Sequence, residues 1–366
     1  MAERAAPCGS GSVVATAYWV TGAGSGELRS HPLGQPGPGE IRVDATHSAI
    51  SRGTERLVRA GLVPAGVAQA MRAPFQAGDF GGEVKYGYLS VGVISQRGPA
   101  LPTEPALALR RRIGSRPDLG VGQRVFCHYP HQDRYVVPQS ALTAVPDEVP
   151  SARATLAGTV ETAINIVWDA RPRWGDRVAV VGVGLVGACV AILLHRMRLH
   201  DLVIVDPDPT THTLAAPLGA RWQHPEAGGG EVDLVIHCSG RQEGLHRGLA
   251  MLDTEGDFIE ASWFGQQCPT APLGADFHAK RLSIRASQVS EVAATNRSRR
   301  SREDRLALAL EELRDPLYDM LITGRTRFAD LPATMARLDD PGTGRWCHVV
   351  DYTGVDDAGV DLEQEQ

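Results

Sequence analysis

The chain has 366 residues, of which 43% are hydrophobic and 22% are charged, and its formal net charge is −6. This composition excludes a fibrous or wholly disordered protein, and at roughly 150 residues per domain the length predicts two or three domains. A net negative charge also argues against a nucleic-acid partner, because such binding depends on a basic surface.

The apolar stretches of the sequence are short. The segment 178–187 is one of the longest, and it falls far below the roughly 20 residues that cross a bilayer. The N-terminus lacks the apolar segment of a secretory signal, and the six cysteines form no C-x-x-C pair. We therefore expect a cytoplasmic protein without membrane contact and without a cysteine metal cluster.

The first half of the chain is predicted to be a β domain that follows a flexible tail at 1–12. Short runs of β-forming residues are found at 13–20, 40–45, 89–95, 124–129 and 135–138. The turn sequence Gly-Gln-Pro-Gly-Pro-Gly at 34–39 excludes a helix between two of these runs. Residues 13–150 are therefore expected to form a barrel or a sandwich.

The second half, over 151–324, is predicted to be an α/β domain. A helix is expected at 151–170, with Ser151 as its N-cap. Strands at 177–181, 202–206, 232–238 and 257–261 alternate with helices at 187–196, 210–218 and 244–251. Apolar strands separated by helices are typical of a doubly wound parallel sheet that is covered on both faces. A helix at 302–313, a last strand at 349–352 and an acidic tail at 355–366 complete the prediction.

A glycine-rich turn follows the first strand of the α/β domain. Residues 177–187 contain the pattern G-x-G-x-x-G, formed by Gly182, Gly184 and Gly187. The first glycine permits a tight turn, the second admits a pyrophosphate, and the third lets the helix pack against the strand. Leu185 and Val186 open that helix, whose free N–H groups attract phosphates. The pattern predicts a dinucleotide site.

The next strand ends at Asp206, 19 residues after Gly187. A carboxylate at this place accepts hydrogen bonds from the adenosine ribose and repels a 2′-phosphate. Because no Arg or Lys lies between Asp206 and Leu218, we predict NAD as the cofactor, with NADP as the less favoured alternative. Ser239, which follows a later strand, is expected to lie beside the nicotinamide ribose.

The order of these segments resembles the medium-chain dehydrogenase/reductase superfamily over about 13–352. The resemblance also rests on Gly122-Gln-Arg-Val125, Tyr135-Val-Val-Pro138 and Glu161-Thr-Ala-Ile-Asn165. It implies a GroES-like β-barrel catalytic domain, completed by about 325–354, and a Rossmann domain at 151–324. It further implies a homodimer that binds a small-molecule substrate between the domains.

The zinc ligands of that superfamily correspond to other residue types in this chain. Ser51 or Arg52 replaces the first cysteine, Tyr88 replaces the histidine, and Gly158 replaces the third ligand. Residues 89–115 also lack the four cysteines of the superfamily's structural zinc. Hydroxyl, guanidinium and phenol groups are poor zinc ligands, so we predict that the protein binds no metal.

The stretches 50–55, 85–92 and 277–288 resemble a zinc-free branch of the superfamily. That branch includes proteins similar to bacteriochlorophyllide hydroxyethyl dehydrogenase. Without zinc, a side chain must polarise the carbonyl group or accept the proton of the hydroxyl group.

Four side chains expected at the cleft are candidates for this catalysis, namely His131, Tyr88, Ser51 and Glu161. Asp133 is expected to orient the imidazole of His131, for which His128 is a competitor. Lys85 is expected to lower the pKa of Tyr88. Glu161 and Thr162 belong to the junction helix near the expected nicotinamide. Purely structural roles, such as packing or capping, stay open for all four candidates.

The sequence therefore favours a zinc-independent, NAD(P)-dependent enzyme that interconverts a secondary alcohol and a ketone. Its expected substrate is a hydroxylated small molecule of the sugar or natural-product class. A quinone or enone reductase and a non-catalytic dinucleotide sensor remain alternatives, because a fold does not fix a function. The motifs G-x-S-x-G and G-x-x-x-x-G-K-[ST] and a triad-like Ser/His/Asp order are not found, so hydrolase and phosphotransferase functions are disfavoured.

Overall fold

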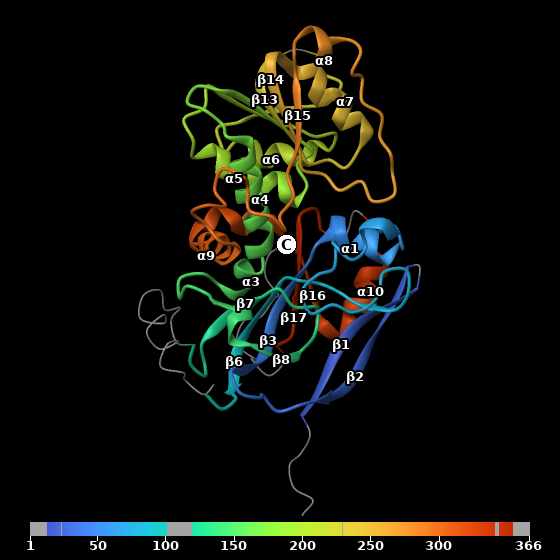
Figure 1. Cartoon of the computed structure of the whole chain (residues 1–366), viewed down its shortest axis with the longest axis vertical. Helices are drawn as coiled ribbons and strands as arrows, with labels where there is room; N and C mark the ends of the chain where they lie inside the picture. Colours follow the sequence, from blue (N-terminus) through green and yellow to red (C-terminus); the bar gives the residue numbers. More distant parts are fainter. Residues whose placement is uncertain (1–12, 23, 101–118, 229, 341–343, 354–366) are drawn as a thin grey trace, which may run out of the picture.

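The structure is a computed structural model that describes residues 13–22, 24–100, 119–228, 230–340 and 344–353. Two domains follow one another along the long axis of the molecule (Figure 1). The tails expected at 1–12 and 355–366 lie outside the described residues. Within the described ranges, no helix is both long enough and apolar enough to cross a membrane.

The upper domain in Figure 1 is built on a parallel sheet of six strands. The strands are β10 (Arg177–Val181), β11 (Asp201–Val205), β12 (Arg221–Gln223), β13 (Val232–His237), β14 (Leu252–Glu260) and β15 (Ser283–Ala286). Their order in the described sheet is β12-β11-β10-β13-β14-β15, with every pair parallel. Numbered along the chain this is 3-2-1-4-5-6, the Rossmann order, which leaves a crevice where the order reverses between β10 and β13. The predicted fold of this half is confirmed.

Helices cover both faces of this sheet. The helices of this half are α3 (Ser151–Ala154), α4 (Ala157–Ala170), α5 (Leu185–His195), α6 (His212–Ala215), α7 (Gln242–Met251), α8 (Asp276–Ala279) and α9 (Arg302–Glu312). Of these, α3 contacts the lower domain and α9 packs on α4. In β10, Val178 and Val180 belong to the core cluster that includes α4, α5 and α9, whereas Ala179 and Val181 belong to the cluster that includes α7. Because alternate side chains of a strand face opposite sides, both must be apolar, which explains the continuous apolar strands.

Several predicted elements differ from those in the structure. The helix expected at 151–170 is divided into α3 and α4, and its N-cap is Pro150 rather than Ser151. The helix expected at 210–218 is reduced to one 3₁₀ turn and α6. Strand β15 was not predicted, because at the sheet edge its side chains are largely exposed and the apolar pattern is missing.

The lower domain contains two sheets in the described part of the chain. A seven-stranded mixed sheet has the order β16-β17-β3-β6-β7-β9, with β8 paired to β3, and a second sheet has the order β2-β1-β5-β4. The strands of the larger sheet are β3 (Glu40–Ile50), β6 (Ser90–Arg97), β7 (Arg124–Cys127), β8 (Arg134–Pro138), β9 (Leu142–Ala144), β16 (Ile322–Arg327) and β17 (Cys347–Asp351). Those of the smaller sheet are β1 (Val13–Gly22), β2 (Ser25–Leu33), β4 (Ala77–Gly78) and β5 (Val84–Lys85). The C-terminal strand β17 pairs antiparallel with β3, so both ends of the described chain contribute to this domain.

Two helices of the lower domain, α1 (Arg52–Arg59) and α10 (Leu331–Ala336), were not predicted. Helix α1 is mostly polar, and its buried residues are Glu55 and Val58. An apolar stripe is the main sequence signal of a helix. Because α1 has almost no such stripe, the sequence pattern did not predict it.

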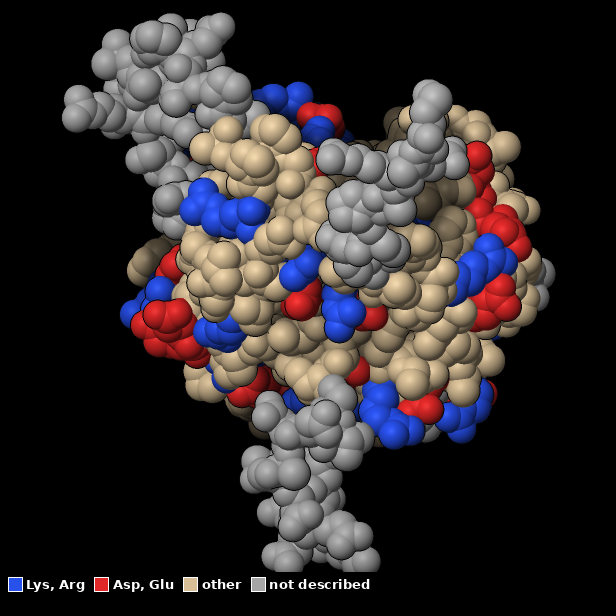
Figure 2. Space-filling view, turned by 90° about the horizontal axis from the view of Figure 1, so that it is seen from below, with Lys and Arg blue, Asp and Glu red and all other residues tan. Residues whose placement is uncertain are grey.

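The charges on the end of the lower domain are mixed. On the face seen in Figure 2, basic and acidic side chains are interspersed among uncharged ones. Several basic groups of this domain are paired, for example Arg29 with Glu83 at 2.7 Å. This face therefore lacks, among the residues described, the continuous basic area that a nucleic-acid backbone requires.

Candidate active site

The turn after β10 forms an open cradle at the start of α5. Gly182 has φ +87°, and a Cβ atom on it would lie 2.4 Å from the Cα atom of Ser239. A Cβ atom on Gly187 would lie 2.1 Å from the carbonyl oxygen of Gly182, so neither glycine tolerates a side chain. Gly184 is the N-cap of α5 without a side-chain capping bond, and a Cβ atom there would meet nothing within 4 Å. The free space and the open helix N-terminus fit the pyrophosphate of a dinucleotide.

The other side chains predicted to bind the cofactor lie near this turn or on the junction helix. Leu185 and Val186 are half-buried at the start of α5. Ser239 is packed beside Gly182. The hydroxyl of Thr162, in contrast, donates to the carbonyl oxygen of Gly158 at 2.9 Å, which is a bond within α4.

Asp206 is buried at the carboxyl edge of the sheet, with 6% of its surface exposed. Burial raises the pKa of its carboxyl group, although hydrogen bonds from the Val183 N–H group and from Arg345 oppose this effect. The Val183 nitrogen lies 2.7 Å from one oxygen, and Arg345 Nη2 lies 2.9 Å from the other. Arg345 also pairs with Asp208. The expectation that no basic group offsets Asp206 is therefore wrong, because the guanidinium group arrives from a segment 139 residues away.

Tyr88 and Ser51 form a pair of hydroxyl groups in the lower domain. The phenol of Tyr88 donates to Ser51 Oγ at 2.5 Å, with Thr54 Oγ1 at 3.4 Å. Burial raises the pKa of Tyr88. The expected effect of Lys85 on this pKa is wrong, because Lys85 Nζ donates to Gln132 at 2.7 Å instead.

His131 lies in the interior of the lower domain, with 1% of its surface exposed. Its Nδ1 atom is 2.7 Å from Ser48 Oγ, and its Nε2 atom is 3.0 Å from Glu55. The predicted partner Asp133 accepts a hydrogen bond from the backbone of Thr16 instead, so this pairing is wrong. Because both ring nitrogens are engaged and buried, His131 is placed to support the structure behind the cleft.

His128, three residues earlier, is less buried, with 29% of its side chain exposed. Its Nδ1 atom is 3.1 Å from the carbonyl oxygen of Tyr88, and its Nε2 atom is 3.1 Å from Glu161. Its two nitrogens therefore face one group of the lower domain and one of the upper domain.

Glu161 is buried and fully engaged. One of its oxygens accepts from Arg305 Nε at 3.1 Å and from Nη2 at 3.0 Å, while the other faces His128. Arg305 is 1% exposed and also donates to Asn165. Because both oxygens of this buried side chain are already engaged, Glu161 is placed to orient His128.

The residues at the superfamily's zinc positions do not fit a zinc ion. Arg52 donates to the carbonyl oxygens of Leu338 and Gly344, and the Tyr88 phenol is bonded to Ser51. A Cβ atom at Gly158 would lie 2.5 Å from Leu89, so a longer ligand side chain has no room. The described residues contain no group of three His, Cys, Asp or Glu side chains that could hold a metal ion. Residues 101–115 of the segment expected to lack the structural zinc lie outside the described residues.

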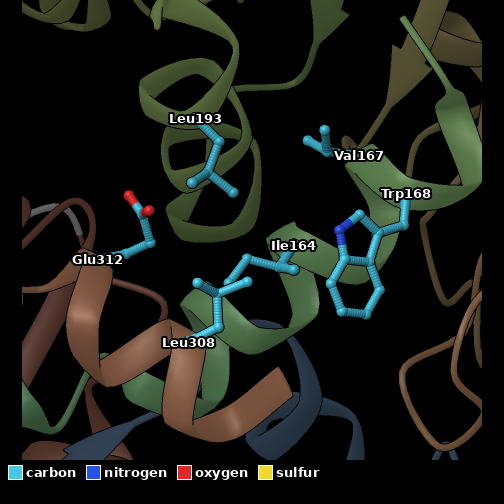
Figure 3. A pocket seen from close by; sticks show the side chains of 6 residues that line it. All are labelled: Ile164, Val167, Trp168, Leu193, Leu308 and Glu312. Atoms are coloured by element: carbon cyan, nitrogen blue, oxygen red, sulfur yellow. The ribbon is translucent and has the colours of Figure 1, made fainter. Parts of the chain in front are cut away.

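A hollow of about 160 Å³ lies on the outer side of the Rossmann domain between α4, α5 and α9. Figure 3 shows its lining side chains, which are Ile164, Val167, Trp168, Leu193, Leu308 and Glu312. Leu193 is eight residues along α5 from Leu185, which is roughly 12 Å at 1.5 Å per residue. This hollow is therefore separate from the cofactor cradle.

No family model matches the chain. The fold is nevertheless similar to several solved dehydrogenase structures. L-idonate 5-dehydrogenase from Escherichia coli is 14% identical with a TM-score of 0.72, and the match covers 93% of this chain and 99% of that one. A putative zinc-binding dehydrogenase from Sinorhizobium meliloti 1021, bound to NADP, is 16% identical with a TM-score of 0.69, covering 93% and 99%. Acetophenone reductase from Geotrichum candidum, in complex with NAD, is 16% identical with a TM-score of 0.70, covering 94% and 98%. At this level of identity the comparisons establish the two-domain fold.

Proposed function

We propose that the protein is a nicotinamide-dependent oxidoreductase that interconverts a secondary alcohol and a ketone without zinc. The observation that carries this proposal is the cradle formed by Gly182, Gly184 and Gly187 at the open N-terminus of α5. The Sinorhizobium meliloti dehydrogenase bound to NADP and the Geotrichum candidum reductase in complex with NAD have the same fold, which supports a cofactor of this class.

When bound, the nicotinamide donates or accepts the hydride, and the protein must manage the oxygen and the proton. Tyr88 donates to Ser51 Oγ, which leaves the Ser51 O–H group to donate to a carbonyl oxygen. Burial raises the pKa of Tyr88, so the phenol stays protonated as a donor. His128, whose ring is partly exposed and is held by Glu161, is the group that exchanges the proton with the substrate oxygen.

His131 is a positioning residue in this proposal. It faces Glu55 at 3.0 Å, and Glu55 accepts a hydrogen bond from the Ser51 backbone nitrogen at 2.7 Å. This chain of contacts fixes the start of α1 and therefore the place of the Ser51 hydroxyl. Geometry fixed in advance lowers the cost of reaching the transition state.

The proposed cofactor is NAD, because Asp206 occupies the place of a ribose-binding carboxylate. Arg345 is the competing influence, since its guanidinium group faces Asp206 and can attract a 2′-phosphate. Replacing Arg345 with Ala removes that attraction. The variant R345A should therefore increase the ratio of NAD(H) affinity to NADP(H) affinity.

The test is turnover of secondary alcohols and ketones by the purified protein with NAD(H) and with NADP(H), alongside elemental analysis. We expect alcohol–ketone turnover with less than one zinc per chain. Turnover of enones or quinones alone would show a different reductase, and cofactor binding without any turnover would show a sensor. One zinc per chain together with activity lost on chelation would overturn the zinc-free mechanism.

The proposal also includes a homodimer in the cytoplasm that acts on small molecules. Strand β15 is the last strand of its sheet within the described residues, and Ile284 on it is 40% exposed. Sheet edges of this kind are available for pairing with a second copy. Light scattering that shows a single chain would contradict this part.

A further inference from the structure

A serine, a histidine and a glutamate meet at the carboxyl edge of the Rossmann sheet, apart from the proposed proton-transfer groups. His237 is the last residue of β13, Glu260 is the last residue of the neighbouring β14, and Ser239 follows β13 by two residues. His237 Nε2 lies 2.5 Å from Ser239 Oγ, and its Nδ1 atom lies 2.8 and 2.9 Å from the two oxygens of Glu260. The parallel pairing of β13 with β14 places His237 directly beside Glu260.

The contacts of His237 determine the direction of its hydrogen bonds. A carboxylate only accepts, so Nδ1 carries the proton that bonds to Glu260, and in the neutral ring Nε2 is left with its lone pair. That lone pair faces the hydroxyl of Ser239. His237 is fully buried, and the backbone nitrogen of Ser262 holds Glu260 in place at 2.8 Å. This is the arrangement in which a histidine acts as the base for a serine nucleophile.

The hydroxyl of Ser239 also lies over the start of α7. A Cβ atom on Gly244, in the first turn of α7, would lie 2.3 Å from Ser239 Oγ, so this position requires glycine. The N-cap residue Arg241 makes no side-chain capping bond, and its backbone nitrogen donates to Ser239 Oγ at 3.1 Å. A developing negative charge beside Ser239 is stabilised by the positive end of the helix dipole.

We propose that Ser239 is a nucleophilic serine that hydrolyses small activated esters, with His237 as base and Glu260 as the group that orients it. Ser239 Oγ attacks the ester carbonyl carbon while its proton moves to His237 Nε2. The bond between this carbon and the ester oxygen then breaks, and the proton passes to the leaving alkoxide, which departs as an alcohol. Water attacks the acyl-serine by the same route, releases the acid and restores the hydroxyl.

This activity goes beyond the proposed dehydrogenase function and is expected to compete with it. Ser239 is half-exposed and is packed beside Gly182, so an acyl group on it would lie next to the cofactor cradle. Acylation of Ser239 in the cofactor-free protein does not depend on the dehydrogenase proposal. A slower acylation of Ser239 in the presence of NADH does depend on it, because NADH must then occupy the cradle. The two proposals can therefore fail separately.

The experiment treats the full-length, cofactor-free protein with p-nitrophenyl acetate, and peptide mass spectrometry locates the acetyl group. We expect p-nitrophenolate release with an acetyl group on Ser239, none at this position in S239A, and a rate lowered by roughly 10²–10⁴-fold in H237Q. S262A is the matched control, because its hydroxyl lies 3.4 Å from His237 Nδ1 and not beside Nε2. It should retain the wild-type rate.

Circular dichroism decides which variants are interpretable. If H237Q does not fold, E260Q takes its place, because it keeps the shape of Glu260 and removes the charge. Wild-type rates in S239A, acetylation confined to other residues, or an unchanged rate in the folded His237 or Glu260 variant would overturn the proposal.

Discussion

The cofactor cradle and the polar cleft of the lower domain are assembled in different ways. In the cradle, the glycine turn and the strand ending before Asp206 are close in sequence, and the Val183–Asp206 bond joins residues 23 positions apart. In the cleft, Ser51 and Tyr88 are 37 positions apart, Glu55 and His131 are 76 apart, and Glu161 and Arg305 are 144 apart. A site built within one strand–turn–helix unit can be predicted from its motif, whereas a site built from elements far apart in the chain cannot.

The first prediction concerns the cleft and carries the largest expected effect. Replacing Tyr88 with Phe or His128 with Asn should lower turnover by roughly 10²–10⁴-fold, because the first change removes the donor that orients the Ser51 hydroxyl and the second removes the proton-exchanging group. NADH affinity, measured by fluorescence titration, should be nearly unchanged, since neither residue contacts the cradle glycines. If both variants keep full turnover in an assay limited by chemistry, the proton passes through another group and the cleft mechanism is wrong.

The second prediction concerns the support behind the cleft. Glu55→Leu should lower the free energy of unfolding by about 3–5 kcal/mol, because it leaves His131 and the Ser51 N–H group buried without their partner. Chemical denaturation measures this loss. Asp79→Asn is the control, since the Asp79 side chain is 87% exposed, and the change should cost less than about 0.5 kcal/mol. Equal losses in the two variants would show that the Glu55–His131 pair does not stabilise the domain.

The third prediction separates the two roles of the cradle glycines. Gly187→Ala should destabilise the protein by about 1–3 kcal/mol, because the new Cβ atom would meet the Gly182 carbonyl oxygen. Gly184→Ala should leave stability within about 0.5 kcal/mol, because its Cβ atom meets nothing, yet it should weaken NADH binding by filling the pyrophosphate space. Thermal unfolding and NADH titration of both variants check this. Unweakened binding by G184A would place the pyrophosphate elsewhere.

The fourth prediction concerns Lys85, whose pKa is lowered by burial to about 8 from an ordinary value of 10.5. Between these values the unfolded chain binds a proton that the folded protein does not, so stability rises with pH. This gain in stability is complete above the pKa that Lys85 has in the unfolded chain. It is lost as the pH falls through about 8. From pH 8 to pH 10 we expect the wild type to gain up to about 2 kcal/mol relative to Lys85→Met. Parallel stability curves would mean that the Lys85 ammonium is not desolvated.

The two histidines of the loop after β7 illustrate where sequence reasoning stops. His128 and His131 are three residues apart, yet His131 is paired with Glu55 of α1 and His128 with Glu161 of α4. The sequence pointed to Asp133 as the partner of His131, because Asp133 is near in the chain. Burial and pairing of a loop side chain depend on which distant elements pack against it, and this information is not local.

The sequence by itself determined the two-domain order, the Rossmann sheet and the glycine turn, because apolar periodicity and the backbone needs of glycine are local properties. That the protein binds no zinc stays a prediction from the residue types at 51, 52, 88 and 158. Only the tertiary structure decided that Arg345 reaches Asp206, that Arg305 holds Glu161, and that Ser239 meets His237 and Glu260. These contacts join segments whose spacing along the chain carries no periodic signal, since they are fixed by the packing of whole strands and helices.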